Sequence, residues 1–406
     1  MAAFANLARR SGLSQLSVRL LNPIVRPDLN VGRPAGPLEL AEYAAALTNI
    51  GARLEALEIL ESLDAEKNED VSLFIAFNHI SIWDYARAIP FLESYIEQQT
   101  DPYKKLVGQV NLAAALVNES QNAAAEELLR DLEMRTRGKS ALRLHANVLE
   151  LRGQLMIDLK RFSDARRDLD RSETLLREAK SLDDFFVLKW KTFLAAEENT
   201  TAENLAALES LKAEAAAKKH WETVRDCDYQ RAKFTRDLTL FNKLFHGTPH
   251  ESFRRRILRY LGGSHIIPEE FDWKPFAEQA GSIVLDVGLG QVGGRRVLKI
   301  GQVLQKLTAA LTADFYRPAR TAMIFARLFP GEHYDPVTSP NRVHKNVSRL
   351  RDWIRGQGLP LEIRQSPTGF RLHAIAPVVL RSRLHKKASR IDHVLAKVFK
   401  AFGENE

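Results

Sequence analysis

The residues best suited to chemistry lie between positions 340 and 356, where hydrogen-bond donors recur at helical spacing. The donors are Asn341, Arg342, Lys345, Ser348 and Arg349. Such groups donate to guanine O6 and N7, to adenine and to backbone phosphates. We therefore expect Asn341, Lys345 and Arg349 to contact base edges or nearby phosphates. Arg342 and Ser348 would then be positioning contacts, and a basic helix face that meets only solvent is the alternative.

These donors can face a ligand only if the other side of the same helix is buried. Four apolar residues fall within about 60° of one another on a helical wheel: Val343, Val347, Leu350 and Ile354. This stripe must face a core, which leaves the donors on the opposite side. Ser339 as the N-cap and Pro340 at the first helical position predict where the helix begins.

The flanking sequence predicts a small α+β domain over residues 282–376. The expected elements are strands at 283–287 and 296–300, helices at 302–313, 318–329 and 340–356, and a hairpin of 361–365 and 370–372. The hairpin alternates apolar and polar residues around the turn 366–369. A hairpin, three helices and a terminal hairpin, in this order, predict a winged helix-turn-helix.

Two stretches of this domain resemble a known family. Residues 331–336, Gly-Glu-His-Tyr-Asp-Pro, resemble the loop before the recognition helix in effector domains of OmpR/PhoB-type response regulators, and 363–372 resembles their closing wing. The apolar stripe of 343–354 is similar to the core of their recognition helix. The chain departs from the family at Ser366-Pro367, where the wing commonly carries Arg-Gly. Because no receiver domain with strand-loop-Asp signals precedes the domain, activation by aspartyl phosphorylation is not implied.

The resemblance implies a DNA-binding regulator that places helix 340–356 in the major groove and the wing, 361–373, on the DNA backbone. Arg364, Thr368 and Arg371 would then flank the helix from the wing. A homodimer would extend the short site that one such domain reads, although the sequence identifies no dimer interface.

Positive charge is concentrated at the C-terminal end of the chain, whose 406 residues have a net charge of +8. Residues 282–406 carry 21 of the 59 Lys and Arg residues but only 9 of the 51 Asp and Glu residues. Neutralised phosphates release counterions, so this basic block favours a polyanion such as double-stranded DNA. Acidic protein or lipid surfaces are the alternatives.

Residues 37–261 predict helices almost throughout, because apolar residues recur every three or four positions. A small residue opens the second helix of each expected pair: Ala56, Ala88, Ala125, Ala165 and Ala207. Small residues recur twelve positions earlier: Ala44, Ala76, Ala113, Gly153 and Ala195. The pattern resembles degenerate tetratricopeptide repeats, best at 83–92, and implies an α-solenoid that binds a protein or peptide partner. A plain helical bundle is the alternative.

Three further segments complete the predicted organisation. Residues 1–36 are expected to form a basic arm, either a frayed helix or a flexible segment, with an organelle-targeting segment as the alternative. Residues 262–281 are expected to be a linker, because the paired glycines at 262–263 cannot sustain a helix. Residues 377–406 are expected to form a basic helix that packs on a domain or a dimer partner, with DNA-backbone contacts or a membrane surface as alternative uses.

The sequence gives little support for catalysis. Residues 288–293 match a dinucleotide-binding pattern, but a second β-like run follows where a phosphate-binding helix would begin, so we expect a hairpin turn. The single cysteine, Cys227, lies between two acids, which disfavours a thiolate, and the 11 histidines show no ligand spacing. We therefore expect no enzyme activity, no cofactor and no metal site.

The sequence thus predicts a mainly α protein in which a tetratricopeptide-like solenoid precedes an α+β winged helix-turn-helix domain. We expect a DNA-binding transcriptional regulator, whose repeats sense a partner or mediate self-association. The rival hypothesis is a protein-protein adaptor, in which the repeats are the working surface and the winged helix binds protein. No apolar run reaches the roughly 18 residues of a membrane span, and the single cysteine fits a reducing compartment, so we expect no membrane partner and a cytoplasmic location.

Overall fold

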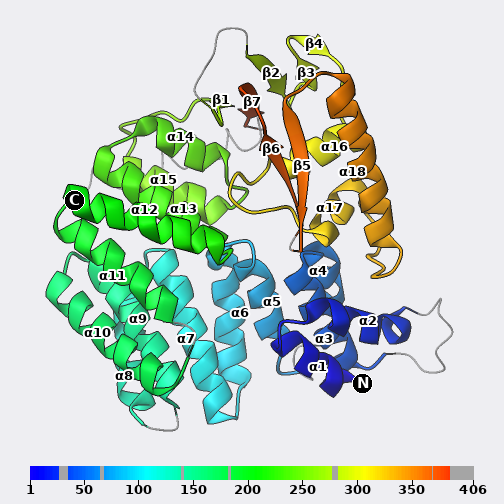
Figure 1. Ribbon diagram of the computed structural model, residues 1–406. Helices are drawn as coiled ribbons and strands as arrows, with labels where there is room; N and C mark the ends of the chain where they lie inside the picture. The colour runs from blue at the N-terminus through cyan, green and yellow to red at the C-terminus, as the bar shows by residue number, and fades with distance from the viewer. Residues whose placement is uncertain are drawn as a thin grey trace. The chain divides into compact units, whose positions relative to one another are not determined.

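The computed structural model describes residues 1–26, 35–64, 68–138, 141–181, 184–276, 282–367 and 369–384. The protein is mainly α-helical, as the sequence predicts, with a small β region toward its C-terminal end (Figure 1). It forms two compact units: unit 1 combines 1–64 with 238–406, and unit 2 spans 65–237. Unit 2 is therefore inserted into unit 1, whereas the predicted domains divide the chain after residues 36 and 261.

Unit 1 contains helices from both ends of the chain and all the β-strands of the described residues. Its helices are α1 (Ala2–Arg10), α2 (Ser14–Val25), α3 (Pro37–Ile50), α4 (Arg53–Glu61), α14 (Leu238–His246), α15 (Glu251–Leu261), α16 (Val303–Leu311), α17 (Thr321–Leu328) and α18 (Ser339–Gly356). Its strands are β1 (Glu270–Trp273), β2 (Ile283–Asp286), β3 (Gln291–Val292), β4 (Arg295–Arg296), β5 (Leu361–Ser366), β6 (Gly369–Ala374) and β7 (Val378–Arg383).

The N-terminal residues, expected to form a frayed basic helix or a flexible arm, form two helices that pack on α3. Val18 and Leu21 are fully buried. Arg9 donates from Nε to Glu42 of α3 over 2.9 Å, which fixes α1 through a charge-assisted hydrogen bond. Val18 and Leu21 therefore form part of a core, whereas Phe4 and Leu7 of α1 are exposed.

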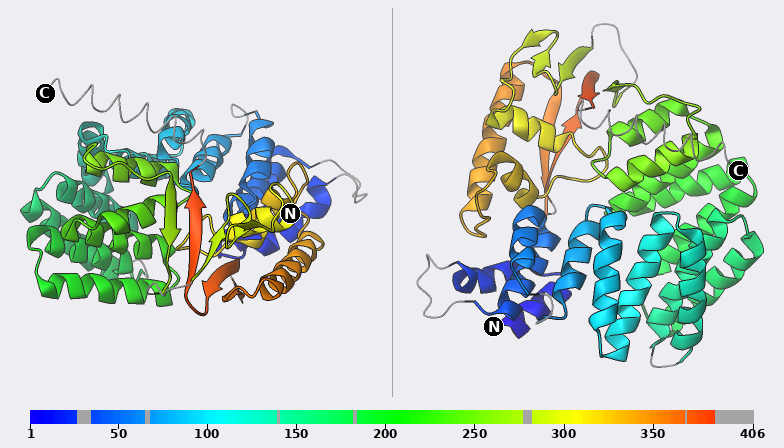
Figure 2. Two further views of the ribbon diagram at one scale, coloured as in Figure 1. Left: turned by 90° about the horizontal axis from the view of Figure 1, so that it is seen from above. Right: turned by 180° about the vertical axis from the view of Figure 1, so that it is seen from behind.

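The strands of unit 1 form two sheets, and the larger sheet contains β7, the last strand along the chain. The five-stranded sheet has the order β1-β7-β2-β3-β4, in which β7 runs antiparallel to β1 and parallel to β2 (Figure 2). The strands β5 and β6 form a separate antiparallel hairpin, as predicted, and its register places Ile363 opposite Leu372. In this hairpin the apolar residues alternate inward, which covers the core next to α18.

Several predicted elements in this region are wrong. The expected linker at 262–281 contains β1, and residues 378–383, assigned to the C-terminal helix, form β7 because Val378, Val379 and Leu380 are buried in the sheet. The remainder of that predicted helix, from 385 onward, lies outside the described residues. The strand expected at 296–300 is reduced to β4. Helix α17 begins at Thr321 because Ala319 forms a β-bridge with Phe370 of β6.

Unit 2 consists of helices in its described residues, and each helix packs on the next along the chain (Figure 1). They are α5 (Val71–Ile80), α6 (Tyr85–Gln98), α7 (Pro102–Asn118), α8 (Asn122–Thr136), α9 (Leu142–Asp158), α10 (Phe162–Glu178), α11 (Asp184–Glu198), α12 (Ala202–Ala217) and α13 (Trp221–Thr235). The predicted anchors Ala88, Ala125 and Ala165 are completely buried. Small side chains at these positions let paired helices approach closely.

A left-handed turn recurs at a fixed distance before four of the anchor alanines. The residues with positive φ five positions before Ala56, Ala88, Ala125 and Ala165 are Gly51, Trp83, Ser120 and Lys160. Such a conformation ends a helix by satisfying its last carbonyl groups. The four helix pairs thus share both a close crossing and a turn geometry, although only Gly51 has the residue type that favours it.

The fifth predicted pair is displaced by one residue. Ala207 is exposed, and the buried residues of α12 are Leu208, which is 1% exposed, Leu211 and Ala215. Twelve positions earlier, Ala196 rather than Ala195 is fully buried. A twelve-residue spacing of buried positions therefore remains, but the predicted register is wrong and the second position, Leu208, is not the small residue that the pattern predicts.

We expect Gly153→Val to lower the free energy of unfolding of unit 2 by about 2–3 kcal/mol. A Cβ at Gly153 would lie 2.7 Å from Cγ of Leu169, which is fully buried, so α9 and α10 would have to separate. Chemical denaturation measures the change. Gly356→Val, at a position with open space around it, is the control and should change stability by less than about 1 kcal/mol. Equal effects at the two positions would contradict the close crossing.

We expect unit 1 to lose stability between about pH 6.5 and pH 4 through His246. Burial lowers the pKa of His246 to about 4, while Nε2 donates to the Pro268 carbonyl over 2.9 Å. The neutral ring is therefore favoured when folded, and protonation favours unfolding as the pH falls below the ordinary histidine pKa. As the pH falls across this range, the urea midpoint of unfolding should decrease less steeply for His246→Gln than for the unaltered chain. An equal decrease in the two proteins would contradict the role of His246.

Candidate nucleic-acid interface

Helix α18 is fixed by its apolar side, as the sequence predicts. Val343 and Leu350 are completely buried, Val347 is 1% exposed and Ile354 is 3% exposed. The helix begins at Ser339, one residue before the predicted Pro340, with Thr338 as its N-cap. Since this stripe faces the core, the rotation of α18 about its axis is determined.

The opposite side of α18 presents the predicted donors to solvent. Asn341, Lys345, Ser348 and Arg349 are all exposed. Arg349 makes one contact, from Nη1 to Oδ1 of Asn346 at 3.3 Å, within the same helix. The helix carries five basic residues against one acidic residue, Asp352. A row of donors at helical spacing is therefore available for a ligand.

Arg342 differs from the other four because it is held by the preceding loop. Its guanidinium lies 3.8 Å from the centre of the Phe329 ring and donates from Nη2 to Oε1 of Glu332 over 3.1 Å. This bond holds the pKa of the Glu332 carboxyl below its usual range. Arg342 thus links the first turn of α18 to the loop between α17 and α18, which we define as residues 329–338.

A second arginine, Arg351, joins α18 to the β5–β6 hairpin. Its Nη2 and Nε donate to the Ile363 carbonyl over 2.7 and 3.2 Å. The ring of His344 also meets the ring of Phe370 edge-on, with 5.2 Å between their centres. These contacts therefore join the helix to the hairpin, and no signal in the sequence distinguishes Arg351 from the exposed arginines.

The three predicted wing residues have different environments. Arg364 is exposed and forms an ion pair with Glu362 of the same strand. Arg371 is half-buried and donates from Nη2 to the Phe315 carbonyl over 2.8 Å, and burial lowers its pKa. The third, Thr368, lies outside the described residues. Arg371 therefore has a structural contact of its own, and Arg364 is the wing cation that faces solvent.

The turn end of the β5–β6 hairpin is hydrogen-bonded to the backbone just before α17. Ala319 and Phe370 exchange two backbone hydrogen bonds, of 2.8 and 2.9 Å. Gly369 adopts a φ of +145°, and a Cβ there would lie 2.2 Å from the Ala319 carbonyl oxygen. Only glycine fits this approach, so the turn between β5 and β6 has a defined place beside α17.

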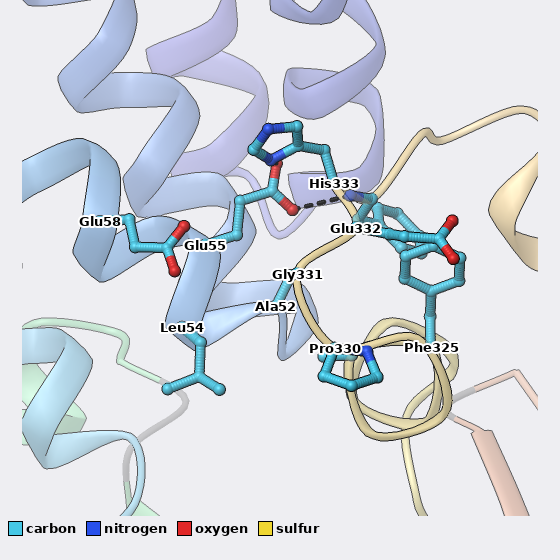
Figure 3. Close-up of a pocket in the computed structure, with 11 residues that line it drawn as sticks. Ala52, Leu54, Glu55, Glu58, Phe325, Pro330, Gly331, Glu332 and His333 are labelled. Carbon is cyan, nitrogen blue, oxygen red and sulfur yellow. Dashed lines mark hydrogen bonds and ion pairs between the residues drawn. The ribbon is translucent and has the colours of Figure 1, made fainter.

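Sequence reasoning missed an acidic residue that holds the loop 329–338. Glu55 of α4 is 9% exposed, and its Oε2 accepts the Tyr334 amide over 2.7 Å (Figure 3). A cavity of about 90 Å³ lies beside this contact and is lined by α4, α17 and the loop. Glu58 also lines it. The pattern of α4 alone could not have revealed the contact, because its partner lies 279 residues away.

The remaining candidate chemistry lies in structural positions. Cys227 is buried in α13, and burial, with help from Asp226, raises its pKa to about 12. Residues 288–290 form the turn between β2 and β3, and β3 follows where a dinucleotide site needs a helix. Across the described ranges, no three His, Cys, Asp or Glu side chains gather as a metal site requires. In the same part of the chain, no helix is both long and apolar enough to span a bilayer.

Comparisons with protein-family models, curated proteins and solved structures find no match to this chain.

We expect Arg371→Gln to lower stability by about 1–3 kcal/mol, because the buried Phe315 carbonyl loses its charged donor. Arg364→Gln, on an exposed side chain of the same hairpin, is the control and should change stability by less than about 0.5 kcal/mol. Thermal and urea denaturation of both variants measure the difference. Equal stability of the two variants would show that the Arg371 contact is dispensable.

Proposed function

We propose that the protein is a DNA-binding transcriptional regulator, with α17, α18 and the β5–β6 hairpin as a winged helix-turn-helix of the OmpR/PhoB kind. Helix α18 would enter the major groove and the hairpin would lie on the DNA backbone. The observation that carries this proposal is the division of α18 into a fully buried apolar side and an exposed side of donors.

The exposed side chains suggest individual roles. Asn341, Lys345 and Arg349 are free to reach base edges and phosphates, and Ser348 lies on the same exposed side. We assign Arg342 to holding the first turn of the helix, in keeping with its position over Phe329. From the hairpin, Arg364 would contact the backbone, whereas Arg371 would support the hairpin from within.

We further propose that the helix pairs are degenerate tetratricopeptide-like repeats that bind a protein or peptide partner, or mediate self-association. The buried small residues and the recurrent left-handed turns support this assignment. A homodimer would place two winged domains on one duplex and so lengthen the sequence that is read. We propose a cytoplasmic, non-enzymatic protein.

We expect the double variant Lys345→Ala/Arg349→Ala to reduce affinity for duplex DNA by at least tenfold and to lessen its dependence on salt. Two lost phosphate contacts would lower the slope of log K against log salt by about two. Fluorescence anisotropy with a mixed-sequence duplex at several salt concentrations measures both quantities. The chain itself should remain folded, because both side chains are exposed.

A matched control removes the same charge elsewhere. Arg87→Ala/Arg177→Ala alters two side chains of unit 2 that are 73% and 76% exposed, and should leave binding nearly unchanged. Equal losses in the two variants would indicate attraction by net charge alone. A folded chain that binds no duplex at low salt would contradict DNA binding and favour the adaptor, in which the winged domain contacts protein.

A further inference from the structure

The loop 329–338 is held from outside by the N-terminal helices of unit 1. Oε2 of Glu55 accepts the Tyr334 amide over 2.7 Å, and Tyr334 itself is 3% exposed. Figure 3 shows the Glu55 carboxylate turned toward the loop beside His333. A charged acceptor on a buried amide makes a stronger bond than a neutral one, so this contact restrains the loop backbone.

The first turn of α18 is shaped within the same loop by Asp335. Its Oδ1 accepts the Thr338 amide over 2.6 Å and the Val337 amide over 2.9 Å. The Asp335 amide in turn donates to Oγ of Ser339 over 2.9 Å. These bonds hold the pKa of the Asp335 carboxyl below its usual range despite partial burial. Asp335 therefore sets where α18 begins.

A hydrogen-bonded chain connects Asp335 to α2 and α3. Nδ2 of Asn22 donates to Oδ2 of Asp335 over 3.3 Å, and the Tyr43 hydroxyl donates to Oδ1 of Asn22 over 2.8 Å. Asn22 is 5% exposed and Tyr43 is fully buried. The amide of Asn22 thus has a fixed orientation, with its donor group aimed at the turn that starts α18.

Charges and close packing reinforce this contact. Arg26 of the N-terminal segment forms an ion pair with Glu55, and Nδ1 of His333 lies 3.7 Å from Oε1 of the same carboxylate. Arg320, just before α17, donates to the Asn49 carbonyl. A Cβ on Gly51 would meet Met323 of α17 at 3.4 Å. The N-terminal helices therefore contact α17 as well as the loop that leads to α18.

We propose that Glu55 and Asn22 are positioning residues for α18, and that the N-terminal helices belong to the DNA-binding body of this protein. This inference rests on the proposed function. A helix that reads base edges must be placed within a fraction of an ångström, by residues that do not themselves touch DNA. The loop 329–338 lies between α17 and α18, so its restraint fixes one helix relative to the other.

The test uses the full chain and three substitutions in α4 and α2. Glu55→Ala removes the acceptor of the Tyr334 amide, Glu55→Gln retains an acceptor without the charge, and Asn22→Ala releases Asp335. Glu58→Ala is the matched control, since Glu58 lies one turn further along the same helix and lines the same cavity. Each variant is measured by amide hydrogen exchange over 331–341 and by affinity for mixed-sequence duplex.

We expect Glu55→Ala to speed amide exchange over 331–341 and to weaken duplex affinity about tenfold, with exchange elsewhere in unit 1 unchanged. Glu55→Gln should keep most of the protection from amide exchange and most of the duplex affinity. Glu58→Ala should match the unaltered chain in both measurements. Should Glu55→Ala fail to fold, Asn22→Ala supplies the same comparison, with faster exchange concentrated at 335–339.

Faster exchange with unchanged duplex affinity would overturn the inference and leave the proposed function intact. Unchanged exchange in both Glu55→Ala and Asn22→Ala would also overturn it, since the loop would then be held by other contacts. An unaltered chain that binds no duplex would overturn the proposed function, and this inference with it.

Discussion

The burial of four aliphatic side chains on the inner side of α18 is the interaction on which the candidate interface depends. Each fully buried Val, Leu or Ile side chain contributes about 1.5–3 kcal/mol, whereas an exposed ion pair contributes about 0.2–1 kcal/mol. The apolar side therefore outweighs the exposed ion pair between Arg342 of α18 and Glu332 of the preceding loop in setting how the helix is rotated. With that rotation fixed, Lys345 and Arg349 can only face outward.

The contacts around α18 join parts of unit 1 that are far apart in the sequence. Glu55 meets Tyr334 across 279 residues, and Asn22 meets Asp335 across 313. Because unit 2 is inserted between residues 64 and 238, both ends of the chain must come together before unit 1 is complete. The entropic cost of closing such a loop grows only slowly with its length, so a large insertion is tolerated. The N-terminal helices and the segment from α16 to β6 thus belong to the same compact unit.

Local patterns predicted much of this fold. The helical periodicity of residues 37–261, the four-residue stripe of α18 and the alternation of β5 and β6 are encoded in neighbouring residues, and the structure has each of them. The twelve-residue spacing of buried small residues holds in the first four pairs, whereas in the fifth pair Ala207 is exposed and Leu208 is buried instead. Where several alanines are adjacent, spacing alone does not select the buried one.

Features that depend on distant partners were not predictable. Residues 378–383 read as the start of a basic helix, but β1 and β2 provide edges on which they form a strand. Arg371 looks like its exposed neighbours in sequence and is distinguished only by the Phe315 carbonyl. Glu55 looks like any surface acid of an amphipathic helix. In each case a long-range partner, absent from the local pattern, determines the role of the residue.

Selection of bound duplexes from a random pool by the full chain, followed by sequencing, tests most directly whether α18 reads DNA. We expect a short enriched motif, which reports contacts between side chains of α18 and base edges rather than phosphates alone. A folded chain that recovers duplexes without any enriched sequence would contradict base reading by α18.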